Sequence, residues 1–189
     1  MGLRQAHKVD IEAIEGLIAR AVMGLMGHEY DEAARRASIG ALFGVDRQVI
    51  EDGTYYVLER QGAIVGAGGW SFRRALFGGD ATSTRDQGRA DPQHEAAHIR
   101  AYYVDPDHSR SGIATLILRH SELQASQAGF RRLALGATLT GVPFYERHGY
   151  VKGPRFTFLL PGDVPFVLQN MTKSLAPGAS ANPPTQVSR

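Results

Sequence analysis

A polar turn between an apolar strand and an apolar helix carries the clearest chemical signal in this sequence. It reads Val104-Asp-Pro-Asp-His-Ser-Arg-Ser-Gly-Ile-Ala114, and helical apolar spacing begins at its end. Unpaired backbone N–H groups and the helix dipole can hold phosphate oxygens at such a helix start. Gly112 admits an anion without a Cβ in the way, and Arg110 can add a countercharge. The turn indicates either a phosphate site or an ordinary strand-to-helix connection.

The turn differs from the two best-known nucleotide-binding motifs. It lacks the lysine-bearing sequence of a P-loop and the three-glycine dinucleotide fingerprint. ATP and NAD therefore have little support as ligands.

A second motif lies further along the chain, in residues 137–151. Together the two segments resemble the GNAT superfamily of N-acetyltransferases. In that family, a strand ending in V-x-P leads to R/Q-x-x-G-x-G/A, and a later strand leads to a short helix that contains F/L-Y and ends in G-F/Y. The matching residues here are Val104-Asp-Pro106, Ser109-Arg-Ser-Gly-Ile-Ala114, Phe144-Tyr145 and Gly149-Tyr150. The resemblance is strongest over residues 98–151 and extends over residues 3–171.

The resemblance implies a single-domain α/β fold, with a mixed central sheet flanked by helices. It implies an acetyl-CoA-dependent N-acetyltransferase that transfers acetyl directly to a primary amine of a small molecule or peptide, with acetyl-CoA as cosubstrate and no metal. The alternative function is a non-catalytic acyl-CoA-binding module. The coenzyme contacts that the resemblance implies are Tyr103, Val104, Ser109, Arg110, Ser111, Gly112, Ile113, Ala114 and Thr138.

Two positions depart from the family pattern. Ser109 stands where the family usually has Arg or Gln, and Thr138 stands where many members have Asn. Because backbone N–H groups mainly hold the diphosphate, Ser109 is tolerable, with Arg110 as a substitute. The loss of the Asn at position 138 removes one contact that it would make with the coenzyme.

Tyr145 occupies the position where the family commonly has its general acid. A phenol with a reference pKa near 10 can protonate a thiolate, whose thiol has a pKa near 8.5, only in favourable geometry. The alternative role for Tyr145 is packing beside Phe144.

His98 lies on the strand that approaches the thioester, where some members that act on small amines carry histidines. A reference pKa near 6.5 suits a general base at neutral pH. A merely structural strand histidine is the alternative, and His94 and Glu95 are other candidates for the base. His120 falls on the apolar side of a helix and His108 in a loop, so neither is assigned to catalysis.

Alternating and helical apolar patterns predict the elements that hold these residues. The predicted strands are 3–9, 54–60, 63–72, 98–104, 130–138, 155–160 and 164–171, with a tight hairpin at Gln61-Gly62. Asp10 is predicted to cap a first helix, which Gly24 and Gly27 weaken at its end and whose apolar stripe is Ile11, Ile14, Leu17, Ile18 and Val22. Further helices are predicted over 31–42, 46–50, 112–128 and 143–148.

Three other groups of residues could bind a ligand, but each also has a purely structural explanation. Residues 73–95 form a long irregular loop with a basic bias from Arg73, Arg74, Arg85 and Arg89, which fits an anionic ligand or simple solvation. Tyr55-Tyr56 and Trp70 with Phe72 could line a substrate slot or belong to the core. Glu29, Asp31 and Glu32 could attract a cationic amine or form an acidic helix start.

Composition narrows the classes further. The 189 residues carry a formal charge of +2 and no cysteine, which argues against nucleic acid as a partner and excludes a disulfide scaffold or thiolate-bound metal. Neither an export signal nor a membrane-spanning stretch is apparent, so we expect a cytoplasmic protein without membrane association. A homodimer remains open. We expect one domain over residues 1–174 and a disordered tail over 175–189.

Overall fold

The computed structural model describes residues 2–74 and 88–175. The strands in this part of the chain are β1 (Gly2–Gln5), β2 (Tyr55–Arg60), β3 (Ala63–Ser71), β4 (Ala97–Val104), β5 (Arg132–Thr138), β6 (Val151–Leu160) and β7 (Val164–Ser174). The α-helices are α1 (Ile11–Leu25), α2 (Glu32–Ser38), α3 (Arg47–Glu51), α4 (Ile113–Gln127) and α5 (Val142–Arg147). Short 3₁₀ helices cover Lys8–Asp10, Pro106–His108 and Leu139–Gly141.

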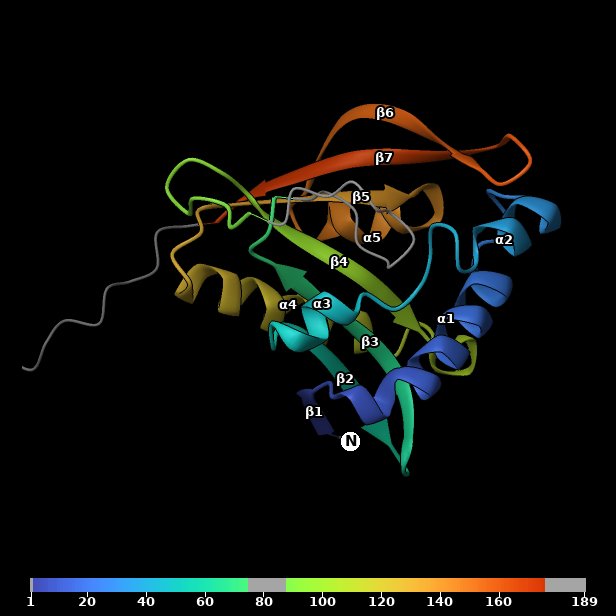
Figure 1. The fold of residues 1–189 in the computed structure, drawn as a ribbon, viewed down its shortest axis with the longest axis horizontal. Helices are drawn as coiled ribbons and strands as arrows, with labels where there is room; N and C mark the ends of the chain where they lie inside the picture. Colours follow the sequence, from blue (N-terminus) through green and yellow to red (C-terminus); the bar gives the residue numbers. More distant parts are fainter. Residues whose placement is uncertain (1, 75–87, 176–189) are drawn as a thin grey trace, which may run out of the picture.

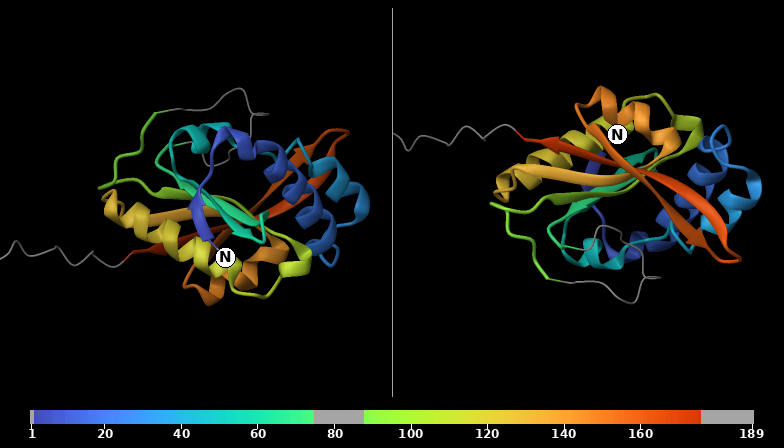
Figure 2. Two further views of the ribbon diagram at one scale, coloured as in Figure 1. Left: turned by 90° about the horizontal axis from the view of Figure 1, so that it is seen from below. Right: turned by 90° about the horizontal axis from the view of Figure 1, so that it is seen from above.

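The strands form one mixed sheet in the order β1-β2-β3-β4-β5-β7-β6. Neighbouring strands are antiparallel except β4 and β5, which run parallel because α4 connects them. Helices α1, α2 and α3 lie on one side of the sheet, and α4 and α5 lie on the other (Figures 1 and 2). The expected α/β class, with a mixed sheet between helices, is confirmed.

Side chains alternate between the two faces of each strand, so a separate hydrophobic core forms on each side of the sheet. Tyr55 and Val57 of β2 pack with α1, whereas Tyr56 and Leu58 point toward the α4 side. The apolar stripe predicted for the first helix supplies Ile14, Leu17, Ile18 and Val22, all at most 1% exposed. The hairpin at Gln61-Gly62 is also confirmed, since both residues have positive φ, at 52° and 78°.

The first helix ends between Gly24 and Gly27, where the glycines were expected to weaken it. Helix α1 ends at Leu25. A Cβ at Gly24 would lie 2.5 Å from Cγ of Pro106, so the glycine lets α1 lie directly against the loop after β4. Arg20 strengthens the same junction, because its Nε donates a 2.8 Å hydrogen bond to Asp105.

Other boundaries differ for local reasons. The first strand ends at Gln5 rather than Val9, because Asp10 turns back to accept hydrogen bonds from the Arg4 guanidinium and the His7 backbone. The carboxylate of Asp10 therefore does not cap α1.

Asp31 does cap α2, by accepting a 2.7 Å hydrogen bond from the Ala34 N–H. That helix ends at Ser38 instead of Leu42, just before Gly40 with its φ of 81°. Strand β6 begins at Val151 instead of Arg155, because an irregularity in register between Lys152 and Arg155 accommodates the intervening Gly-Pro pair.

Two expectations fall largely outside the described residues. These are the centre of the 73–95 loop, including Arg85, and the tail after Leu175. Within the described part, Arg73 pairs with Asp52 and Arg74 with Glu95. None of the helices in residues 2–74 and 88–175 is long and apolar enough to cross a membrane.

Candidate active site

Strands β4 and β5 pair at one end only. Their parallel register covers Ala97 with Leu133 and His98 with Ala134, although the strands continue to Val104 and Thr138. Strand β4 therefore separates from β5 toward Val104. Beyond His98, the two strands leave a wedge in the middle of the sheet.

A backbone irregularity in β4 lies beside this wedge. Ala101 has a φ of 54°, and the β3–β4 register shifts between Ala67 and Gly69. A left-handed alanine costs about 1–3 kcal/mol and persists only where its surroundings hold it. The hydroxyl of Tyr55 does so, because it donates a 2.7 Å hydrogen bond to the Ala101 carbonyl.

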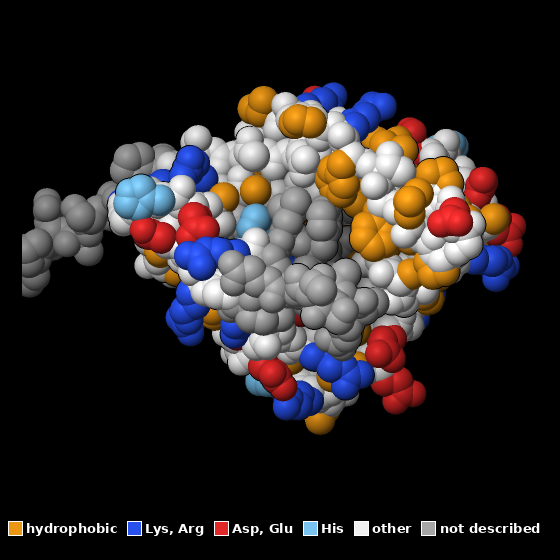
Figure 3. Space-filling view, turned by 45° about the horizontal axis from the view of Figure 1, so that its top comes forward, with side chains coloured by type: hydrophobic (Ala, Val, Ile, Leu, Met, Phe, Trp, Pro, Cys, Tyr) orange, Lys and Arg blue, Asp and Glu red, His pale blue; other side chains and the backbone are white. Residues whose placement is uncertain are grey.

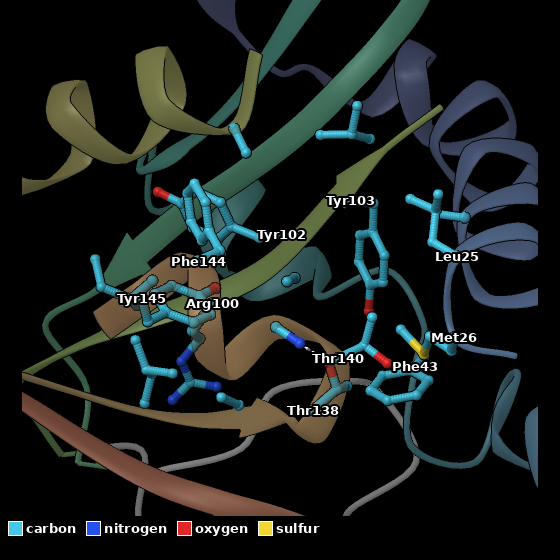
Figure 4. Close-up of a pocket in the computed structure, with 18 of the residues that line it drawn as sticks. Leu25, Met26, Phe43, Arg100, Tyr102, Tyr103, Thr138, Thr140, Phe144 and Tyr145 are labelled. Carbon is cyan, nitrogen blue, oxygen red and sulfur yellow. Dashed lines mark hydrogen bonds between the residues drawn. The ribbon is translucent and has the colours of Figure 1, made fainter. Parts of the chain in front are cut away.

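A cavity of about 670 Å³ opens from the wedge, a volume typical of small-molecule sites. Both sides of the sheet contribute to it: Tyr102, Phe144 and Tyr145 line one part, and Tyr103, Leu25 and Met26 line another (Figure 4). Among the predicted coenzyme residues, the cavity lining includes Tyr103, Val104, Ser109, Arg110, Gly112, Ile113, Ala114 and Thr138.

The turn before α4 has the backbone expected of an anion site. Gly112 caps the helix with a φ of 83°, and no side chain supplies a capping hydrogen bond to the first N–H groups. A Cβ at Gly112 would meet no described atom within 4 Å, so the space above the glycine is open. The side chain of Ser111, which is outside the cavity lining, bonds back to the His108 carbonyl. The backbone donors of α4 therefore face the cavity without an internal acceptor from a capping side chain.

Thr138 has a local structural role. Its hydroxyl accepts a 3.2 Å hydrogen bond from Gly141 N–H and caps the 3₁₀ turn that leads into α5. A coenzyme contact from Thr138 stays a prediction, because a hydroxyl that accepts one bond can still donate another.

Tyr145 is 8% exposed and lines the cavity from α5. Its ring packs edge-on against Tyr102 and Tyr150, with centroids 6.5 and 5.5 Å away. Burial raises the pKa of Tyr145 above its usual value, so the phenol keeps its proton at neutral pH. It can donate a hydrogen bond to an electron-rich atom in the cavity.

A histidine that the sequence reasoning missed ties α5 to α4. Nε2 of His148 lies 3.1 Å from the Thr115 hydroxyl, and its Nδ1 lies 2.8 Å from the Phe144 carbonyl. A carbonyl only accepts, so Nδ1 carries the proton and Nε2 accepts from Thr115. This link fixes the tyrosine-bearing helix to the first turn of the anion site.

His98 lies away from this group. It lines a second cavity with His94 and Glu95, and it is absent from the lining of the first. Burial lowers the pKa of His98 from 6.5 to about 4, with the Arg100 charge as a further cause. The structure brings the predicted coenzyme residues together but does not bring His98 to Tyr145, so its role as base stays a prediction.

The other candidate ligand groups have structural partners. Tyr55 and Tyr56 are buried on opposite faces of β2, and Trp70 packs against Phe72 and Phe130. The acidic start of α2 is explained by the cap and by an ion pair between Glu32 and Arg36. His120 packs on Tyr56, with ring centroids 4.4 Å apart.

The sequence matches the Acetyltransferase (GNAT) family over residues 24–150, which is more than half of the chain. The chain belongs to the GNAT acetyltransferase family. It has no match among curated proteins. The family match includes the turn before α4 and the helix that carries Tyr145, the two motifs that the resemblance rested on.

Solved structures share the fold of this GNAT acetyltransferase. A GCN5-related N-acetyltransferase from Rhodopseudomonas palustris superposes with a TM-score of 0.70 at 22% identity, over 92% of this chain and 95% of that chain. The PaiA N-acetyltransferase from Thermoplasma acidophilum, in complex with coenzyme A, gives 0.60 at 12% identity, over 92% and 98%. A ribosomal-protein-alanine N-acetyltransferase from Brucella melitensis gives 0.60 at 16%, over 93% and 100%.

Part of the lining of the GNAT cavity was not predicted. Arg100 of β4 and Asp46, which precedes α3, line the cavity as an ion pair with Nη1 and Oδ2 3.2 Å apart. An arginine inside a largely apolar strand was a readable signal. Phe43 also lines the cavity, but it lies in a connection with no periodic pattern, so no sequence signal marked it.

Proposed function

We propose that this protein is an acetyl-CoA-dependent N-acetyltransferase that transfers acetyl directly to a primary amine. One observation carries the proposal: a single cavity joins the first turn of α4, which has no capping side chain, the wedge between β4 and β5, and the side chain of Tyr145. Acetyl-CoA needs an anion site for its diphosphate, a slot for its extended arm and a reactive centre for its thioester. The turn before α4 would be the anion site, the wedge would be the slot, and Tyr145 would lie at the reactive centre.

The residues present suit the coenzyme. Backbone N–H groups after Gly112 would hold the diphosphate, since no capping side chain occupies them and no Cβ fills the approach. Arg110 and Arg147 both line this end and would supply positive charge. The unpaired stretch of β4 near Tyr103 and Val104 would align with the arm, as a neighbouring strand would.

Acetyl-CoA supplies the activated acyl group as a thioester. In the transfer, the amine nitrogen forms a bond to the acetyl carbon, the carbon–sulfur bond breaks, and the sulfur leaves with the electron pair. The nitrogen loses a proton and the sulfur gains one. Tyr145 would donate its hydroxyl hydrogen to the departing sulfur. Its raised pKa keeps the phenol protonated before the transfer, and the proton that the nitrogen releases restores the hydroxyl, so the step balances.

The second candidate is a non-catalytic acyl-CoA-binding module. The turn before α4 would serve both functions, but a buried phenol inside the same cavity favours the enzyme.

Thiol release from acetyl-CoA over a panel of amines and peptides separates them, with mass spectrometry of the products. The enzyme acetylates at least one acceptor at a rate above the background hydrolysis of acetyl-CoA. Coenzyme binding without transfer to any acceptor would support the binding module.

A further inference from the structure

The cavity has two chemically different ends. The end at α4 contains Arg110 and Arg147, which suit an anionic coenzyme. The opposite end is mainly apolar and is built by the end of α1, the connection after α2, and β7. Its apolar lining residues are Ala21, Leu25, Met26, Leu42, Phe43 and Leu168.

Aromatic contacts hold this apolar end in shape. Phe43 packs edge-on against Tyr103 and Phe166, with ring centroids 6.4 and 5.4 Å apart. Tyr30 stacks on Phe166 at 4.0 Å. The Tyr30 hydroxyl donates a 2.7 Å hydrogen bond to the Val167 carbonyl. In Figure 4 the Tyr103 ring points toward Phe43 and Met26. The wall is therefore preorganised for an apolar group.

The charge of the one lining carboxylate is already balanced. Asp46 is the sole carboxylate among the described residues that line the cavity. Its Oδ2 lies 3.2 Å from Nη1 of Arg100, and both side chains are at most 5% exposed. A buried cation needs a counter-charge of its own, and Arg100 already uses this one. A second ammonium group on an acceptor would find no free carboxylate in the described lining.

The apolar character continues to the surface. Hydrophobic side chains gather on the end of the molecule where α1, α2 and the tip of the β6–β7 hairpin meet (Figure 3). Leu42, Phe43 and Val164 are among the partly buried hydrophobic residues that pack on the α1 core there. An acceptor that reaches the wedge from this side passes apolar surface.

We infer that the acceptor is an apolar monoamine, with one primary amino group on an aromatic or branched hydrocarbon body, and that Phe43 helps to select it. The inference rests on the proposed function. The hydrocarbon body lies against Phe43 and Met26, and the amino group extends toward the wedge between β4 and β5. Polyamines and other polycationic acceptors are disfavoured because Asp46 is neutralised.

Thiol release with phenethylamine and with spermidine tests the inference. We expect kcat/KM for phenethylamine to exceed that for spermidine by about tenfold or more, because a buried ammonium without a counter-ion costs more than about 1.4 kcal/mol. Phe43→Ala should raise the KM for phenethylamine about tenfold and leave the KM for acetyl-CoA unchanged, and Phe43→Leu should restore most of the loss. Leu123→Ala, on the exposed face of α4, is the control and should change neither KM.

A substitution at the apolar end should also change which amine the protein prefers. Leu25 is partly exposed at the apolar end, so Leu25→Glu would add a second carboxylate to the described lining, and it should shift preference toward spermidine. Higher kcat/KM for spermidine in the native protein, or an unchanged phenethylamine KM in Phe43→Ala, would overturn the inference while leaving the proposed transfer intact.

If the proposed acetyl transfer is wrong, the thiol-release assay gives a different result. Acetyl-CoA would then bind, but no acceptor would release thiol. Calorimetry of the two amines with the CoA-saturated protein still decides the inference in that case. Tighter binding of phenethylamine supports an apolar pocket, and tighter binding of spermidine, or no binding of either, contradicts it.

Discussion

The hydroxyl of Tyr55 donates a 2.7 Å hydrogen bond to the carbonyl of Ala101, the residue at which β4 adopts a left-handed backbone. Tyr55 is 1% exposed and reaches across from β2. Its hydrogen bond therefore couples the hydrophobic core to the irregularity beside the wedge between β4 and β5. We regard Tyr55 as a positioning residue for the acetyl-transfer site.

Tyr55→Phe should lower both stability and turnover. The Ala101 carbonyl would lose its buried partner, at a cost of about 1–3 kcal/mol in the free energy of unfolding. If the irregularity then relaxes, kcat should fall while the KM for acetyl-CoA changes less, because the diphosphate site lies at α4. Urea unfolding and steady-state kinetics measure the two effects. A stability loss with unchanged kcat would show a structural role alone.

Tyr145→Phe removes the hydroxyl that we assign to the departing sulfur. We expect kcat to fall by about 100-fold, with little change in coenzyme affinity, as is typical of a lost general acid.

The pH dependence of the native enzyme adds a second readout. Burial raises the pKa of Tyr145 above 10, so the phenol stays protonated as the pH rises, and no loss of rate from its ionisation is expected below about pH 10. A native rate in Tyr145→Phe would remove this residue from the proton path.

His98→Gln separates a structural from a catalytic histidine. The pKa of His98 is about 4 in the fold and near 6.5 in an unfolded chain, so the unfolded state binds more protons between these values. Stability should therefore fall as pH drops from about 6.5 to 4, by up to about 3 kcal/mol, and His98→Gln should lessen that fall.

The rate gives the second readout for His98. With a pKa near 4, His98 is neutral throughout pH 6–8, so it produces no acid limb of kcat/KM near 6.5. An acid limb near 6.5 that disappears in His98→Gln would assign the base to His98 and contradict its depressed pKa.

Substitution of Gly112 tests the anion site by charge alone. Gly112 has a φ of 83°, a conformation that Asn and Asp tolerate better than other side chains, so Gly112→Asn and Gly112→Asp form a matched pair. Only the aspartate repels a diphosphate, and we expect its acetyl-CoA affinity to be lower than that of the asparagine variant by about tenfold or more. Calorimetry measures both, and equal affinities would argue against a phosphate at this helix start.

Much of the fold follows from local pattern. Periodicity predicted α1 and α4, alternation predicted the β2–β3 hairpin, and Asp31 marked the start of α2. These features depend on neighbours in the sequence. The end of the first strand was wrong because Asp10 turns back onto Arg4, a side-chain contact that periodicity does not report. The contact of Gly24 with Pro106 was likewise not predictable, because these residues are far apart in the sequence.

The candidate site also has a part that the sequence predicted and a part that it did not. The turn at Gly112 and the position of Tyr145 are contiguous motifs, so the sequence marked them. The rest of the cavity lining includes Arg100, Asp46 and Phe43 from separate elements, and only the folded chain brings them to one cavity. The separation of His98 from Tyr145 was likewise invisible, because it depends on where β4 stops pairing with β5.

A crystal structure of the protein with bound CoA would locate the coenzyme directly. We predict diphosphate oxygens within hydrogen-bonding distance of backbone N–H groups between Ser111 and Ala114, with the sulfur in the wedge beside Tyr145. Coenzyme bound elsewhere, or a diphosphate with no contact to the start of α4, would contradict it.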